Sequence, residues 1–143
     1  FGVVFVALVL AQTIEEPLDL GRLLAIAALH DLPEALTTDI PTPAWRYLPP
    51  GIKTEVERGA MQELLVETEF APAFMDLWEE LHAAITPEAK LVHDADKLEM
   101  FLQAMMYEKQ TGNQQLEEFW ERPYHVHYPQ AQASYDMMSI SRQ

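Results

Sequence analysis

The sequence lacks the residues that several enzyme classes require. It contains no cysteine, which excludes disulfides, thiolate metal sites and thiol nucleophiles and is typical of a reducing compartment such as the cytoplasm. Its 5 glycines form no phosphate-binding loop, and no G-x-S-x-G motif presents a nucleophilic serine. Any catalytic chemistry is therefore expected from histidine and carboxylate side chains.

Basic residues are also scarce, since 9 Lys and Arg oppose 23 Asp and Glu for a net charge of −14. Such a surface repels polyanions, so we expect no polymeric nucleic acid as a partner. A small anionic substrate stays possible if a metal ion reverses the potential locally. The longest apolar run, residues 1–11, is shorter than the roughly 18 residues that cross a bilayer, so we expect a buried helix and no membrane span.

The pattern of apolar residues predicts an all-α fold. A chain of 143 residues with 49% hydrophobic content can build one domain with a core, and no stretch alternates with the period of a strand. We expect one domain over residues 1–143 with about six to seven helices. Asp19 and Thr86 should cap helices, and the proline-rich residues 38–51 should form a loop. The expected helical segments, two of them with six residues or fewer, cover residues 1–14, 20–31, 34–37, 53–70, 74–85, 89–111, 116–121 and 130–141.

His30 and Asp31 follow a nearly all-apolar helical run, residues 23–29. A charge carried into the interior is costly unless it is paired or bound to a metal, and an imidazole with a carboxylate suits a divalent cation. The plain alternative is a satisfied core histidine beside a capping aspartate. Glu34 follows a possible break at Leu32-Pro33. On a continuing helix it would share a face with the pair, and three such groups repel unless they share a proton or a cation.

Asp96 lies on the predicted helix 89–111 between Val92 and Met100, in its core-facing zone. An acid in such surroundings needs a partner, which could be a metal ion. A salt bridge, or a position at the solvent-exposed edge of the helix, is the alternative explanation. His93 shares this face and is expected to be a surface or supporting residue rather than a ligand.

Three other histidines give weaker signals. Glu79 and His82 form an E-x-x-H motif, but carboxylate di-metal bundles need two copies, and no second copy exists. His125 and His127 alternate in a proline-bounded segment, where an exposed loop is the default interpretation and weak metal binding the alternative.

Three segments resemble known motifs. Residues 30–43, HDLPEALTTDIPTP, resemble the signature of HD-domain phosphohydrolases, and more narrowly the 5'-deoxynucleotidase form H-D-x-x-E-x-x-x-x-D-[IL]-P-T-P. Residues 95–100, ADKLEM, and residues 116–121, LEEFWE, are similar to further segments of that branch. The resemblance implies an all-helical bundle, usually a homodimer, that hydrolyses (deoxy)ribonucleoside 5'-monophosphates with a divalent cation such as Co, Mn, Cu, Mg or Zn.

The same resemblance implies roles for individual residues. The metal ligands would be His30, Asp31 and Asp96. Asp31 would also belong to the catalytic group with Glu34, which handles the proton or orients water. The wall of the nucleotide pocket would consist of Asp39, Ile40, Pro41 and Thr42. Lys97, beside Asp96, is a candidate for contacting the phosphate, and a surface lysine is the equal alternative.

One feature departs from the family. Its first metal ligand is a histidine on the preceding helix, and no histidine precedes His30 here. We therefore expect that the chain starts just after that residue and that an upstream arginine and tryptophan are also missing. The alternatives are a non-catalytic helical HD-type binding or signalling module, and a hydrolase of another phosphorylated nucleotide.

Overall fold

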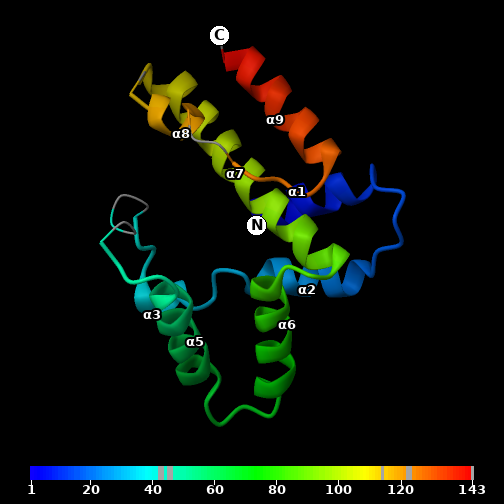
Figure 1. Ribbon diagram of the computed structural model, residues 1–143, viewed down its shortest axis with the longest axis vertical. Helices are drawn as coiled ribbons and strands as arrows, with labels where there is room; N and C mark the ends of the chain where they lie inside the picture. The colour runs from blue at the N-terminus through cyan, green and yellow to red at the C-terminus, as the bar shows by residue number, and fades with distance from the viewer. Residues whose placement is uncertain (42–43, 45–46, 114, 122–123, 143) are drawn as a thin grey trace.

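The longest helix, α7 (Pro87–Thr111), runs through the middle of the molecule and carries Asp96 (Figure 1). At its start the hydroxyl of Thr86 accepts a hydrogen bond from the backbone N–H of Ala89 at 3.3 Å, and Gly112 ends it with a φ of 69°. The predicted cap is therefore confirmed. This computed structural model describes residues 1–41, 44, 47–113, 115–121 and 124–142.

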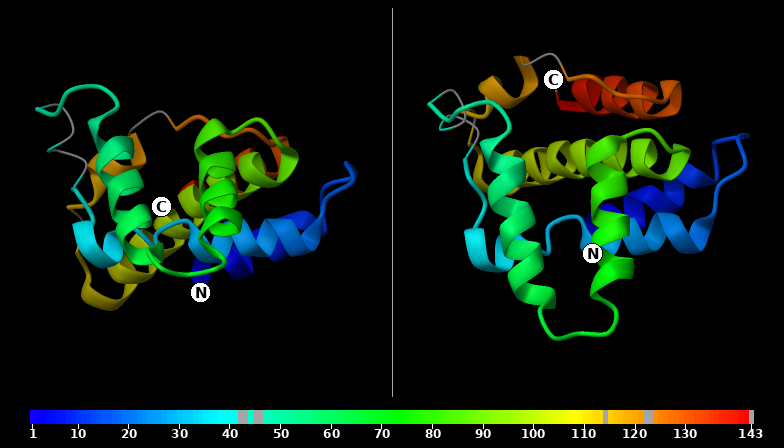
Figure 2. Two further views of the ribbon diagram at one scale, coloured as in Figure 1. Left: turned by 90° about the horizontal axis from the view of Figure 1, so that it is seen from below. Right: turned by 60° about the horizontal axis from the view of Figure 1, so that its bottom comes forward.

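The described residues form helices and no strand, which confirms the predicted all-α fold. The helices other than α7 are α1 (Gly2–Ala11), α2 (Leu20–Leu29), α3 (Glu34–Thr37), α5 (Ile52–Leu65), α6 (Ala71–Ala83), α8 (Glu117–Glu121) and α9 (Pro129–Arg142). Helices α1, α2 and α9 pack on α7, while α6 contacts both α2 and α7. Helices α5 and α6 form a hairpin that extends away from α7 (Figures 1 and 2). None of the described helices is long and apolar enough to span a bilayer.

The main core lies between α1, α2 and α7, where small and branched side chains interlock. Ala7, Leu23, Ile26, Leu91 and Ala95 are almost completely buried in it. Since burial of such side chains is the main driving force of folding, this core sets the position of α2 against α7. The C-terminal end of α2 thereby comes to lie beside the middle of α7.

Two predicted helices end three or more residues earlier than expected. Helix α1 stops at Ala11 instead of residue 14, and α5 stops at Leu65 instead of residue 70. Beyond α5, the hydroxyl of Thr68 donates to the carbonyl of Leu65 at 2.7 Å and Glu67 takes a φ of 65°, so local side-chain bonding turns the chain. Val56, expected on the buried face of α5, is 43% exposed because the helix packs mainly on α3 and α6.

Candidate functional site

The candidate site begins where α2 ends. The side chain of Asp19 caps α2 by accepting from the N–H of Arg22 at 3.0 Å, and the helix ends at Leu29. His30 and Asp31 lie in the turn that follows, and Glu34 opens α3. The chain therefore breaks at residues 30–33, and this turn, not one continuous helix face, places the three polar side chains together.

The His30 ring is held in one orientation. Its Nδ1 donates to the carbonyl of Ala27 at 2.6 Å, and because a carbonyl only accepts, this bond assigns the proton of the neutral ring to Nδ1. Nε2 is buried, and with the ring proton on Nδ1 it has no hydrogen to donate. It lies 2.8 Å from Oδ2 of Asp31 and 3.9 Å from Oδ1 of Asp96. The lone pair of Nε2 thus faces two carboxylates, which is stable only with a shared proton or cation.

The electrostatics of the cluster point the same way. Burial disfavours the charged imidazolium of His30, but the carboxylates of Asp31 and Asp96 outweigh it and raise the His30 pKa. The pKa of Asp96 is also raised, chiefly because surrounding protein displaces water from its carboxylate. The charge of His30 lowers this pKa, and the charge of Asp31 raises it further. The Asp96 side chain is nevertheless 55% exposed, against 16% for His30. The carboxylate side of the cluster is therefore open to an entering cation.

A small polar cavity of about 130 Å³ contains the cluster. It gathers the three predicted metal ligands and the predicted catalytic acid in one place, although α7 is distant from the α2–α3 turn in the sequence. Its lining residues are His30, Asp31, Glu34, Lys53, Glu57, Leu81, His82, Val92, His93 and Asp96.

Glu34 has an environment that favours its protonated form. Burial raises its pKa, and the negative charges of Asp31 and Asp39 raise it further. A carboxyl group whose pKa is raised holds a proton more readily than an ordinary glutamate, which suits it to proton transfer. Asp39, Ile40 and Pro41 lie outside the lining of the cavity, where Asp39 and Pro41 are exposed and Ile40 is half-buried, and Thr42 lies outside the described residues.

The donor set fits a divalent cation. Metal-binding histidines usually donate the other ring N–H to a carbonyl or carboxylate, as the Nδ1 of His30 does to Ala27, and the buried Nε2 has no other hydrogen-bond partner among the described residues. Two aspartates supply the oxygen donors. No three His, Asp or Glu side chains of the described residues lie close enough together to hold a metal ion as placed. The proposed donors therefore share one cavity, but as placed they do not surround a single metal position.

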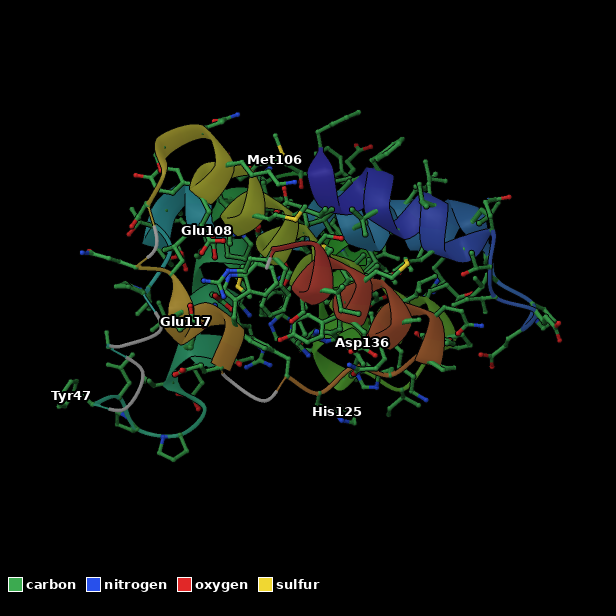
Figure 3. The ribbon with its side chains drawn as sticks, turned by 90° about the horizontal axis from the view of Figure 1, so that it is seen from above. Tyr47, Met106, Glu108, Glu117, His125 and Asp136 are labelled. Atoms are coloured by element: carbon green, nitrogen blue, oxygen red, sulfur yellow. The ribbon has the colours of Figure 1, made fainter. Side chains whose placement is uncertain are left out.

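Lys97 lies outside the cavity lining, although a phosphate contact was predicted for it. Its Nζ donates to the carbonyl of His125 at 2.6 Å, in the loop that leads into α9 (Figure 3). Adjacent residues on a helix point apart, so Asp96 faces the cavity while Lys97 fastens this loop. The Nε2 of His93 lies 2.7 Å from the carbonyl of Leu81, a supporting contact of the expected kind.

Two groups of polar residues that the structure places in or near the core were not predicted from the sequence. Lys53, Glu57 and His82 line the cavity from α5 and α6, and the only signals for them were an i,i+4 Lys–Glu spacing and the E-x-x-H motif that was set aside. Asp94, fully buried on α7, accepts from the N–H groups of His127 and Tyr128 at 2.8 Å each. Helical spacing offered a signal for Asp94, because it lies three residues after Leu91 and four before Leu98, on the buried face of α7.

Comparison with known proteins extends these observations. The family model described as HD domain matches residues 1–137. A protein of Dictyostelium discoideum named 5'-deoxynucleotidase HDDC2 is 38% identical over 95 residues, covering 65% of this chain and 49% of its own length. The human protein of the same name is 34% identical over 103 residues, covering 70% of this chain and 50% of its own length. The chain spans about half the length of the curated relatives it matches.

Solved structures share the fold. A conserved hypothetical protein from Pyrococcus furiosus superposes with a TM-score of 0.70 at 38% identity, covering 82% of this chain and 67% of that one. The PH0347 protein from Pyrococcus horikoshii OT3 gives a TM-score of 0.72 at 35% identity, covering 98% of this chain and 78% of that one. With the family model matching nearly the whole sequence, this chain belongs to the HD domain family.

Proposed function

We propose that this protein is a metal-dependent phosphomonoesterase that hydrolyses (deoxy)ribonucleoside 5'-monophosphates to nucleoside and phosphate. The observation that carries the proposal is the buried Nε2 of His30, which faces Asp31 and Asp96 in the cavity that also contains Glu34. The curated relatives named 5'-deoxynucleotidase support the substrate class.

His30, Asp31 and Asp96 would hold the cation. When bound, a divalent cation supplies positive charge for the phosphate and lowers the pKa of water. The candidate ions remain Co, Mn, Cu, Mg and Zn, because imidazole with carboxylates is compatible with each of them.

Glu34 would manage the proton. Water attacks phosphorus, the bond from phosphorus to the 5'-oxygen breaks, and the proton lost by water passes through Glu34 to the leaving oxygen. The raised pKa of Glu34 suits both steps of this transfer. We propose that Asp39, Ile40, Pro41 and Thr42, at and after the end of α3, form the wall against the nucleoside, where prolines limit the entropy lost on binding.

The direct test is phosphate release from deoxynucleoside monophosphates by the purified protein with each candidate metal. In the Asp96→Ala variant we expect loss of bound metal, measured by elemental analysis, together with loss of phosphate release. Asp136→Ala, which removes an exposed carboxylate on α9, is the matched control and should keep both. Retained stoichiometric metal in Asp96→Ala would show that the ligand is misassigned, and no release by wild type with any metal would favour a non-catalytic HD-type module.

We further propose that the protein is a homodimer through an apolar groove of about 450 Å³ between α1, α7 and α9. Phe5 of α1 is 57% exposed beside it, and α1 contains no charged residue, so two copies can meet there despite the net charge of −14. Phe5→Glu should convert a dimer to a monomer in size-exclusion chromatography with light scattering. A monomeric wild type would contradict the proposal.

A further inference from the structure

The cavity is dominated by negative charge. Four carboxylates line it, from Asp31, Glu34, Glu57 and Asp96, and among the lining residues Lys53 alone is a lysine or arginine. A phosphate monoester is itself a dianion near neutral pH, so it would be repelled by this lining unless cationic groups meet its oxygens. A cation at the His30 cluster neutralises one side of the cavity only.

Lys53 enters the lining of the cavity from a different helix. His30 and Asp31 lie in the turn after α2 and Asp96 lies on α7, whereas Lys53 lies in the first turn of α5, the helix that forms the hairpin with α6 (Figure 2). The positive charge of Lys53 partly offsets the rise in the Glu34 pKa, so its field reaches the predicted proton carrier.

The position of the lysine is set by neighbouring groups. Its Nζ lies 3.2 Å from Oε1 of Glu57, one helical turn further on, and the other oxygen of Glu57 lies 3.7 Å from Nε2 of His82. The His82 ring is held in turn by the Trp78 carbonyl, 2.9 Å from Nδ1, and by the Trp78 ring, whose centroid is 3.9 Å away. The Glu57 side chain is only 12% exposed, against 33% for Lys53. The ammonium of Lys53 is therefore paired with a largely buried carboxylate, while a third of the lysine side chain stays accessible.

We propose that Lys53 binds the phosphate oxygens of the substrate from the part of the cavity that α5 lines, and that Glu57 is the residue that positions it. This inference rests on the proposed function, which it deepens by naming the protein group that selects for a phosphate. It also explains how the phosphate is bound when Lys97 is engaged with the carbonyl of His125.

The decisive variant is Lys53→Met, which keeps the length of the side chain and removes its charge. Loss of a charge-assisted contact is expected to raise KM for a deoxynucleoside monophosphate by about 10- to 100-fold. The inhibition constant of inorganic phosphate should rise similarly, while inhibition by the nucleoside product stays unchanged. Lys53→Arg should recover part of the loss, and Lys109→Met, an exposed lysine near the end of α7, should behave as wild type.

The role of Glu57 is tested by a double-mutant cycle. Glu57→Gln should raise the inhibition constant of phosphate in the wild-type background and have little further effect in Lys53→Met, since a positioning residue acts only through the group it positions. Additive effects would overturn this role. The thermal midpoint of each variant, measured by circular dichroism, confirms that it is folded.

Failure of the inference is distinguishable from failure of the proposed function. An active wild type whose KM and phosphate inhibition are unchanged in Lys53→Met overturns the role of Lys53 alone. An inactive wild type overturns the proposed function, and calorimetric titration of inorganic phosphate into manganese-loaded wild type and Lys53→Met then decides the inference. Weaker phosphate binding by Lys53→Met supports it, whereas equal binding or no binding by either protein overturns it.

Discussion

Replacing Glu34 by glutamine is expected to lower kcat for nucleoside monophosphate hydrolysis by about 10²- to 10⁴-fold, the usual contribution of a general acid–base group. The amide keeps the shape of the side chain but cannot carry the proton from water to the 5'-oxygen. Glu34 is not among the proposed metal ligands, so bound metal should be retained. Elemental analysis and steady-state kinetics on the same preparation measure both effects.

The matched control is Glu63→Gln, which removes an exposed carboxylate on α5 outside the cavity lining and should leave kcat unchanged. Near-wild-type turnover in Glu34→Gln would remove Glu34 from the mechanism. Loss of metal in that variant would instead place Glu34 among the ligands.

Replacing Asp94 by alanine is expected to lower the free energy of unfolding by about 2–5 kcal/mol. Its carboxylate is fully buried and accepts from the backbone N–H of His127 through both oxygens, at 2.8 and 3.0 Å, and from the N–H of Tyr128 at 2.8 Å. Alanine would leave both N–H groups without an acceptor in a site closed to water. The same loop is fastened by Lys97 through the carbonyl of His125.

Chemical denaturation of Asp94→Ala measures this loss, and Asp76→Ala is the control. Asp76 is exposed on α6, where substitutions usually change stability by no more than about 0.5 kcal/mol. Asp94→Asn keeps one acceptor oxygen and should fall between alanine and wild type. Equal stability of Asp94→Ala and Asp76→Ala would show that the loop does not depend on this carboxylate.

The helices and their caps could largely be predicted because the interactions that set them are local. Asp19 and Thr86 accept from N–H groups three residues further on, and Gly112 supplies the positive φ after α7. The end of α5 was predicted wrongly although the interaction that sets it is also local. The bond from Thr68 to the Leu65 carbonyl competes with the helix, and the apolar pattern alone carries no sign of that competition.

The site residues likewise fall into those that the sequence could place and those that only helix packing could place. Neighbourhood in the chain was enough to place His30, Asp31 and Glu34 together. Asp96 was expected in the core-facing zone of its helix, but its side chain is 55% exposed, so its apolar neighbours in the sequence overstated its burial. Helical spacing states which residues share a face, but it does not state which face of another helix lies opposite. Packing of α2 on α7 therefore decided that Asp96 meets His30, and packing of α5 and α6 decided that Lys53, Glu57 and His82 complete the cavity while Lys97 turns to the His125 loop.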